Sequence, residues 1–376
     1  MQRLRIKERP DWQQIVENQG FMFHSIDEKY WDESVCYAFS EREILNLEKA
    51  TNQLFEMCME AMQRIIDKKL YALFKIPPEF HELIAFSWEN DLPSIYGRFD
   101  LAYNGHEIKM LEFNADTPTS LLESAVIQWF WLQDFDKNKD QFNSIHEKLI
   151  SHFKYLKPDL RSGEVHFACV KESVEDYMTV AYLMDCAGQA GLDTNFLYLE
   201  DIGYNTKEGR FEGIKNEKIN TIFKLYPYEW MLAEEFGKYL GSTKKETHWI
   251  EPAWKMVLSN KMILRVLWEM FPNHQYLLET SLTPPLSGNY VRKPFLSREG
   301  ANVQVVRYGK ILAETQGTYG AEGYVYQQYM NITDSDGFTP VLGTWVIGGE
   351  AAGMGIRETS GLVTGNLSRF VPHYFV

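Results

Sequence analysis

Two segments with alternating side chains, residues 96–101 and 111–118, constrain this chain more than any other feature. Asn104-Gly105 lies between them and is typical of a tight turn, so the segments are expected to pair as an antiparallel hairpin. The hairpin carries one arginine, three carboxylates and one amide: Arg98, Asp100, Glu112, Asp116 and Asn114. Such oxygens suit Mg²⁺, and an arginine beside them can hold a carboxylate or a phosphate. The hairpin is therefore a candidate metal and phosphate site.

The length of the turn decides whether these side chains meet. Successive side chains of a strand point to opposite faces, so a two-residue turn would separate the polar side chains of the first segment from those of the second. A three-residue loop with Gly105 in a left-handed bulge would bring them to one face. Shared metal chemistry therefore predicts a bulged turn at Asn104-Gly105.

The overall composition limits the classes of partner. The chain has 376 residues, 45% of them hydrophobic, which indicates a folded protein too long for one simple core. Its net charge of −14 argues against nucleic-acid binding. That charge would suit a cationic substrate such as a polyamine, although many acidic proteins carry it for solubility alone.

Membrane and secretion signals are not apparent in the sequence. No apolar run approaches the roughly 20 residues that span a bilayer, so a membrane is not an expected partner. The N-terminus lacks the apolar stretch of a signal peptide. Four widely spaced cysteines show neither zinc-site nor disulfide spacing. A reduced, cytoplasmic protein is expected.

Changes of pattern divide the chain into three predicted regions, 1–160, 161–255 and 256–376. The first ninety residues are expected to be helical. One helix begins near Pro10, and a second follows the capping-box pair Ser40 and Glu43 and ends near Asp67. After the hairpin, residues 117–120 are expected to cap a helix whose first amides can receive an anionic group.

The second and third regions differ in their strand patterns. The second alternates strands at 165–170, 196–199 and 221–226 with a helix at 174–191, which predicts a parallel sheet. Glu229 follows its last strand, at the edge where open α/β sheets bind ligands. The third region contains strands at 290–295, 303–306, 324–330 and 341–346, which predict an antiparallel sheet of its own.

Two lysines and a loop of small residues form a second candidate site. Lys261 lies on a predicted helix, and Lys293 lies on a strand ahead of the loop 296–302. Backbone amides of such a loop can bind phosphate oxygens, while a lysine supplies a point charge. The chain has neither a Walker A motif nor a dinucleotide fingerprint.

Two further segments are candidates for nucleotide contacts. The strand 326–330 is either an ordinary buried strand or one whose backbone pairs with an adenine edge, and it contains Gln328, Tyr329 and Met330. Near the C-terminus, Arg357 with Gly361 and Asn366 offers another arginine that can steady a transferred phosphoryl group.

The order of these motifs resembles the synthetase domain of the glutathionylspermidine synthases. The matching residues run through nearly the whole chain: Arg98-Phe99-Asp100, Glu112-Phe113-Asn114, Lys261, Lys293-Pro294, Arg298-Glu299-Gly300, Gln327-Gln328 and Arg357. That family has an ATP-grasp fold, in which two lobes hold ATP between antiparallel sheets. The resemblance implies an α+β or α/β chain with an N-terminal helical and mixed-sheet region and a C-terminal antiparallel-sheet nucleotide-binding lobe.

The resemblance also implies roles for single residues. Mg²⁺ is expected on Asp100, Glu112 and Asn114. ATP contacts are expected from Arg98, Phe99, Asp100, Lys261, Lys293, Gly300, Gln328, Tyr329 and Met330. The expected catalytic residues are Arg98 and Arg357, and the candidate substrate contacts are Thr117 and Glu229. Bifunctional members carry an N-terminal cysteine amidase domain. No Cys–His nucleophile pair is apparent here, so the chain resembles the stand-alone relatives more closely.

The expected function is an ATP- and Mg²⁺-dependent acid–amine ligase. A carboxylate would attack the γ-phosphate of ATP to give an acyl phosphate, and an amine would displace phosphate to form an amide. The acid is expected to be a small molecule or a peptide, and a polyamine is one candidate amine. The alternatives are a small-molecule kinase on the same scaffold and a nucleotide-binding accessory protein without catalysis. Residues 297–302 are a candidate lid that excludes water.

Overall fold

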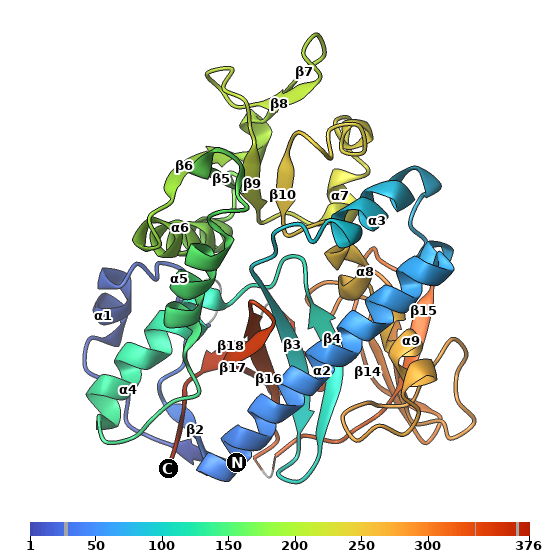
Figure 1. Ribbon diagram of the computed structural model, residues 1–376. Coiled ribbons are helices and arrows are strands. Elements are labelled where there is room, and N and C mark those ends of the chain that lie inside the picture. The colour runs from blue at the N-terminus through green and yellow to red at the C-terminus, as the bar shows by residue number, and fades with distance from the viewer. Residues whose placement is uncertain (26–28, 335, 366–367) are drawn as a thin grey trace.

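The computed structural model describes residues 1–25, 29–334, 336–365 and 368–376. An antiparallel sheet lies at its centre (Figure 1). Its strands, in spatial order, are β18 (Arg369–Val371), β17 (Glu350–Thr359), β16 (Thr339–Ile347), β3 (Tyr96–Tyr103) and β4 (Ile108–Asn114). Every residue of β16 is buried, so this strand forms part of the core. The predicted hairpin is thus confirmed as β3–β4, at one edge of this sheet.

A 28-residue helix, α2 (Glu41–Lys68), crosses one face of the central sheet (Figure 1). Its N-terminus has the predicted capping box, in which the Ser40 side chain accepts from the Glu43 backbone and the Glu43 side chain accepts from the Ser40 backbone. The buried stripe of the helix packs on the sheet, where Thr51 Oγ1 donates to Thr344 Oγ1 at 2.9 Å. The predicted limits of this helix are confirmed.

The other face of the central sheet is covered in part by a second group of helices. They are a π-helical turn, η3 (Glu123–Ile127), then α4 (Gln128–Asp136) and α5 (Ile145–Leu156). The helical stretch begins at Leu121, as the cap at 117–120 predicts. This packing needs glycine on β17, because a Cβ at Gly355 would lie 2.4 Å from Ser124 Oγ.

A separate parallel sheet confirms the βα pattern of the second region. Its strands are β10 (His248–Ile250), β9 (Thr221–Lys224), β5 (Glu164–Cys169) and β6 (Asp193–Tyr198), and α6 (Val174–Gln189) connects β5 to β6. A small hairpin of β7 (Gly203–Asn205) and β8 (Arg210–Glu212) projects beyond this sheet (Figure 1). The short helix α7 (Tyr228–Met231) follows β9, and α3 (His81–Glu89) precedes β3.

The lid sheet, as we call the second large antiparallel sheet, follows α8 (Lys255–Ser259) and α9 (Met262–Met270). It consists of β11 (Thr280–Ser281), β15 (Tyr324–Gln328), β12 (Tyr290–Pro294), β13 (Gln304–Arg307) and β14 (Lys310–Glu314). The strand expected at 341–346 was wrongly placed in this sheet, because β16 pairs with β3 instead. The limits proposed for the three regions stay a prediction.

The first ninety residues are not all helical, which corrects the sequence-based expectation. Besides α1 (Trp12–Asn18), they contain β1 (Gln2–Arg5) and β2 (Val35–Phe39). These two strands form a small sheet with β19 (His373–Phe375), so the two ends of the chain lie in one sheet. Pairing between strands that are far apart in the sequence leaves no local signal from which it could be predicted. No helix within the described residues has the length and apolar character needed to cross a membrane.

Candidate active site

A large cavity of about 850 Å³, which includes space open to solvent, is lined by residues of the central sheet and of the lid sheet. Eight residues predicted to bind ATP or Mg²⁺ line it: Asp100, Glu112, Lys261, Lys293, Gly300, Gln328, Tyr329 and Met330. Apolar residues form much of the remaining wall, among them Val291, Val305 and Val341. A cavity that combines apolar walls with a few charged groups suits a nucleotide.

The β3–β4 hairpin brings its polar side chains to one face, but the turn is not the cause. Tyr103 pairs with Ile108 across the loop 104–107, and the register shifts farther along, where Leu111 is an extra residue on β4. Beyond this bulge Arg98 lies opposite Asn114. The shared face is therefore confirmed, whereas the predicted bulge at Asn104-Gly105 is wrong. At the bulge, the Leu111 carbonyl accepts from Lys293 Nζ at 3.0 Å.

Arg98 is fixed in place by its own strand, by the segment that precedes η3 and by the neighbouring strand β16. Its Nε and Nη2 donate to the two Asp100 oxygens at 2.7 and 3.1 Å, and its Nη1 donates to the Thr119 carbonyl at 2.6 Å. The side chain lies over Gly343 of β16, where a Cβ would be 2.9 Å from Arg98 Cδ. Only glycine leaves this room, so the neighbouring strand determines the position of the guanidinium.

Glu112 and Asn114 complete the oxygen-rich face. Glu112 lies 3.1 Å from Lys261 Nζ and accepts from Asn114 Nδ2 at 3.3 Å. Burial opposes its ionisation, but Lys261 and then Lys293 outweigh burial and lower the pKa of Glu112 to about 2. The carboxylate is therefore charged at physiological pH.

Two carboxylates and one amide on this face fit Mg²⁺, which takes one or two carboxylates and shares the rest of its coordination with phosphates and water. Among the residues that the structure describes, no three His, Cys, Asp or Glu side chains are grouped to hold a metal ion. The set Asp100, Glu112 and Asn114 would therefore depend on substrate phosphate oxygens to complete the coordination.

Lys293 is held by Gln327, which the sequence analysis placed in a matching motif without giving it a role of its own. Its Nζ donates to Gln327 Oε1 at 2.8 Å, and Gln327 Nε2 donates to the Met110 carbonyl at 3.0 Å. Gln327 is buried, whereas the Gln328 side chain is exposed. Strand alternation along 324–328 is the signal that would have identified Gln327 as the inward-facing amide.

Affinity for MgATP is expected to fall as the pH rises through about 8. Burial lowers the pKa of Lys293 to about 8, although Glu112 opposes the shift. Phosphate binds the protonated amine, so binding is favoured below this pKa and weakens above it. Isothermal titration calorimetry over this range measures the effect. The control Lys293→Arg keeps its charge and should show a flat profile; an equally flat profile for the unmodified chain would contradict the prediction.

A small cavity adjoins the large one through Asp100, which lines both. Arg98, Arg357 and Ser120 also line it, so the two predicted catalytic arginines face one space. Arg357 Nη2 donates to the Gly365 carbonyl, while its buried Nε has no hydrogen-bond partner among the described residues. Asn366, which the sequence grouped with Arg357, lies outside the described residues.

Three carboxyl groups were missed by the sequence analysis, and two of them, Glu123 and Glu175, interact with the charge of Arg357. Burial and then Glu175 raise the pKa of Glu123 to about 7 and that of Asp176 to about 6. Burial also raises the pKa of Glu175, against the charge of Arg357. Glu175 and Asp176 occupy the first turn of α6, where acidic residues are common in any helix, so their sequence gave no distinguishing signal.

Comparison with known proteins identifies the family. A family model for the glutathionylspermidine synthase preATP-grasp matches residues 3–376. The chain belongs to this family. A Haemophilus influenzae protein named "Putative acid–amine ligase" is 43% identical over 386 residues, which cover 98% of each chain.

Two other similar proteins are longer than this chain. The trypanothione synthetase of Crithidia fasciculata is 30% identical over 346 residues, covering 85% of this chain and 53% of the relative. The bifunctional glutathionylspermidine synthetase/amidase of Escherichia coli is 26% identical over 355 residues, covering 87% and 57%. The chain therefore spans about half the length of these two relatives.

In this member of the glutathionylspermidine synthase family, Arg298 joins the two candidate substrate residues. Its Nη1 donates to Thr117 Oγ1 at 2.7 Å, and its Nε donates to Glu229 Oε1 at 3.0 Å. Both residues are therefore near the site, but each is bound by the loop 296–302. The same loop reaches residue 364, since a Cβ at Gly300 would lie 2.4 Å from the Thr364 carbonyl. The loop thus rests against the walls of both cavities.

Two residues of the hairpin region differ from their predicted surroundings. The Phe99 side chain is fully buried on the α2 face and stacks on Phe113 at 3.9 Å between ring centroids, so only its main chain can contact a nucleotide. Asp116 is also buried. It pairs with Lys224 Nζ at 2.6 Å and accepts from the Tyr228 backbone at 2.9 Å. It therefore anchors the hairpin to the parallel sheet instead of joining the metal set.

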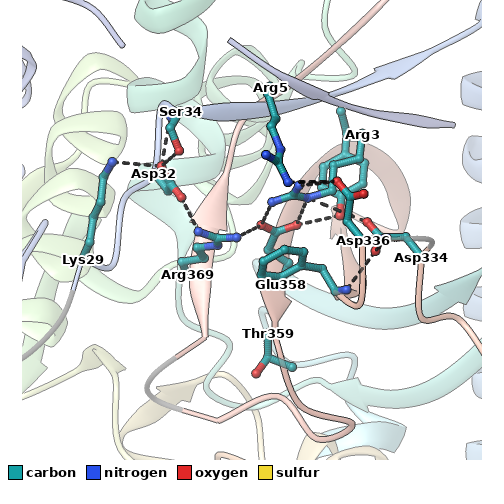
Figure 2. A network of polar contacts seen from close by, with 12 residues as sticks. Arg3, Arg5, Lys29, Asp32, Ser34, Asp334, Asp336, Glu358, Thr359 and Arg369 are labelled. Atoms are coloured by element: carbon teal, nitrogen blue, oxygen red, sulfur yellow. Dashed lines mark hydrogen bonds and ion pairs between the residues drawn. The ribbon is translucent and has the colours of Figure 1, made fainter. Parts of the chain in front are cut away.

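A polar network surrounds Glu358 (Figure 2). Glu358 follows Arg357 on β17, so the two side chains point to opposite faces of the sheet. Glu358 is fully buried, and both its oxygens accept from Arg3 at 3.0 Å. Arg369 Nη2 lies 2.7 Å from the same carboxylate, and Tyr37 Oη donates to it at 2.7 Å. Because β1 supplies Arg3, the network ties the N-terminal strand to the strand that carries Arg357.

Proposed function

We propose that this chain is an ATP-dependent ligase that joins a carboxylate to an amine through an acyl phosphate. The observation that supports it most is the position of Asp100 between the two cavities. The large cavity gathers Glu112, Lys261 and Lys293, and the small one holds both predicted catalytic arginines. The names of the Haemophilus and Crithidia relatives support the same reaction class. The proposed nucleotide site corresponds to an ATP-grasp arrangement between the central and lid sheets.

The residues of the two cavities have separate tasks in this proposal. Lys261 and Lys293 hold phosphate oxygens as point charges. Mg²⁺, held by the two carboxylates and the amide of β3–β4, would neutralise charge on the phosphates. Arg98 and Arg357 stabilise the phosphoryl group during transfer to the acid. The loop 296–302, already bound to Thr117 through Arg298, excludes water that would hydrolyse the acyl phosphate.

The amine is proposed to be a cation at neutral pH, with a polyamine as one candidate. Glu175 interacts with Arg357 and Arg98, which both line the small cavity, and the whole chain carries a net charge of −14. Thr117 and Glu229 remain candidate contacts for a substrate. All four cysteines are buried and unpaired, in keeping with the proposed reduced, cytoplasmic setting.

The test is a search by mass spectrometry for amide products in cell extract supplied with ATP, Mg²⁺ and the purified chain. Glutathione and spermidine are tested separately as defined probes. An ATP-dependent amide supports the ligase. A phosphorylated acid that forms without any amide would favour a kinase, and tight ATP binding without phosphate release in any extract would leave only the accessory role.

A further inference from the structure

Glu123 is a fully buried carboxyl group with no evident structural task. It begins the π-helical turn η3, and its side chain has no exposed surface. Its Oε1 accepts from Tyr30 Oη at 2.6 Å, whereas its Oε2 has no hydrogen-bond partner among the described residues. A buried carboxylate with an unpaired oxygen is costly, and π-helical turns are frequent at functional sites. Both observations indicate a role beyond packing.

A chain of hydroxyl groups connects this carboxyl group to the small cavity. Tyr30 Oη lies 3.0 Å from Ser120 Oγ, and Ser120 lines the small cavity together with Arg98 and Arg357. Ser120 has a φ of +67°, an unfavourable conformation for a residue with a side chain. Because Tyr30 Oη donates to Glu123, the Ser120 hydroxyl can donate to Tyr30 in turn. The hydrogen bonds therefore run in one direction, from the cavity to the carboxylate.

The surroundings of Glu123 set its basicity near neutrality. Burial and the neighbouring Glu175 raise its pKa to about 7, while the hydrogen bond from Tyr30 and the charge of Arg357 oppose the shift. A proton acceptor is most useful when its pKa lies near the working pH.

We propose that Ser120, Tyr30 and Glu123 form a relay that removes a proton from the substrate ammonium ion before it attacks the acyl phosphate. The inference rests on the proposed ligase function. An N–H bond of the ammonium breaks and its proton passes to Ser120 Oγ, the Ser120 proton passes to Tyr30 Oη, and the Tyr30 proton passes to Glu123 Oε1. The free amine then forms the C–N bond, the C–O bond to phosphate breaks, and the second amine proton leaves with the phosphate. Glu123 returns its proton to solvent after turnover.

The variants Glu123→Gln and Tyr30→Phe test this relay with two nucleophiles. Amide formation from glutathione and ATP is measured with spermidine, which is an ammonium ion at neutral pH, and with hydroxylamine, which is largely neutral there. Both variants should lose about 10²–10⁴-fold in rate with spermidine and change little with hydroxylamine. The control Tyr182→Phe removes another buried phenol hydroxyl, which is hydrogen-bonded to His146 at 3.0 Å. Any change in rate that it causes should be the same with spermidine and with hydroxylamine. Equal losses with both nucleophiles, or none, would overturn the relay.

Infrared titration of the substrate-free chain keeps this test separate from the ligase proposal. A protonated-carboxyl band should disappear as the pH rises through about 7, should be missing in Glu123→Gln and should shift in Tyr30→Phe. If no such band exists, the relay is wrong even when ligase activity is found. If the band titrates as expected but no acid and amine are ever joined, the proposed function fails and the relay's chemistry fails with it.

Discussion

Replacing Arg98 with lysine is expected to lower ATP-dependent turnover by about 10²–10³-fold while changing the affinity for MgATP little. Lysine keeps a positive charge beside Asp100, so the carboxylate, whose side chain is 15% exposed, is not left unpaired. It cannot reproduce the two parallel hydrogen bonds to Asp100 together with the bond to the Thr119 carbonyl. Arg98 lines the small cavity and not the large one, which is why the loss should appear in turnover.

The measurement compares magnesium-dependent phosphate release with calorimetric MgATP affinity for the same variant. Arg265→Lys is the matched control, because Arg265 pairs with Glu269 along one helix face, away from both cavities. That control should match the unmodified chain in both measurements. A large loss of affinity with unchanged turnover would show that Arg98 contributes ground-state binding, contrary to its proposed role.

Replacing Glu358 with alanine is expected to cost about 3–5 kcal/mol of unfolding free energy. The change leaves Arg3 and Arg369 without their shared carboxylate (Figure 2). It also leaves Tyr37 Oη without its acceptor. The Arg3 side chain is only 7% exposed, so water cannot replace the lost partner fully.

Glu350→Ala is the matched control on the same strand. Glu350 also forms an ion pair, with Lys148 at 2.9 Å, but its side chain is 74% exposed, so the loss should be about 0–1 kcal/mol. Urea unfolding of both variants gives the comparison, provided the slope of the transition stays unchanged. Similar midpoints for the two variants would mean that the buried network contributes little beyond an exposed pair.

The sequence predicted the parts of this fold that have local signals. The capping pair at Ser40 and Glu43 marks the start of α2, and the βα alternation of the second region marks the parallel sheet. Strands whose partners are distant gave no such signal. β1 pairs with β2 and shares a sheet with β19 at the other end of the chain, and β16 leaves the lid sheet to pair with β3.

In the candidate site, too, features with a local sequence signal were predicted and features without one were missed. Residue type and order identified the lining of the large cavity, because charged residues on strands are unusual enough to stand out. The bulge at Leu111 was missed, since an extra residue in a ladder has no composition of its own. Glu123 was missed because only its burial and its contact with Tyr30 distinguish it from any other helical glutamate.

The transfer of oxygen from the acid to phosphate tests the central claim most directly. The purified chain is supplied with ATP, Mg²⁺, spermidine and glutathione labelled with ¹⁸O in its carboxylates, or with the acid that the extract search identifies. Attack of the carboxylate on the γ-phosphate, followed by displacement by the amine, must carry one labelled oxygen into each inorganic phosphate. The account predicts that one singly labelled phosphate is released for each amide bond that forms. Amide formed alongside unlabelled phosphate would contradict the acyl-phosphate route.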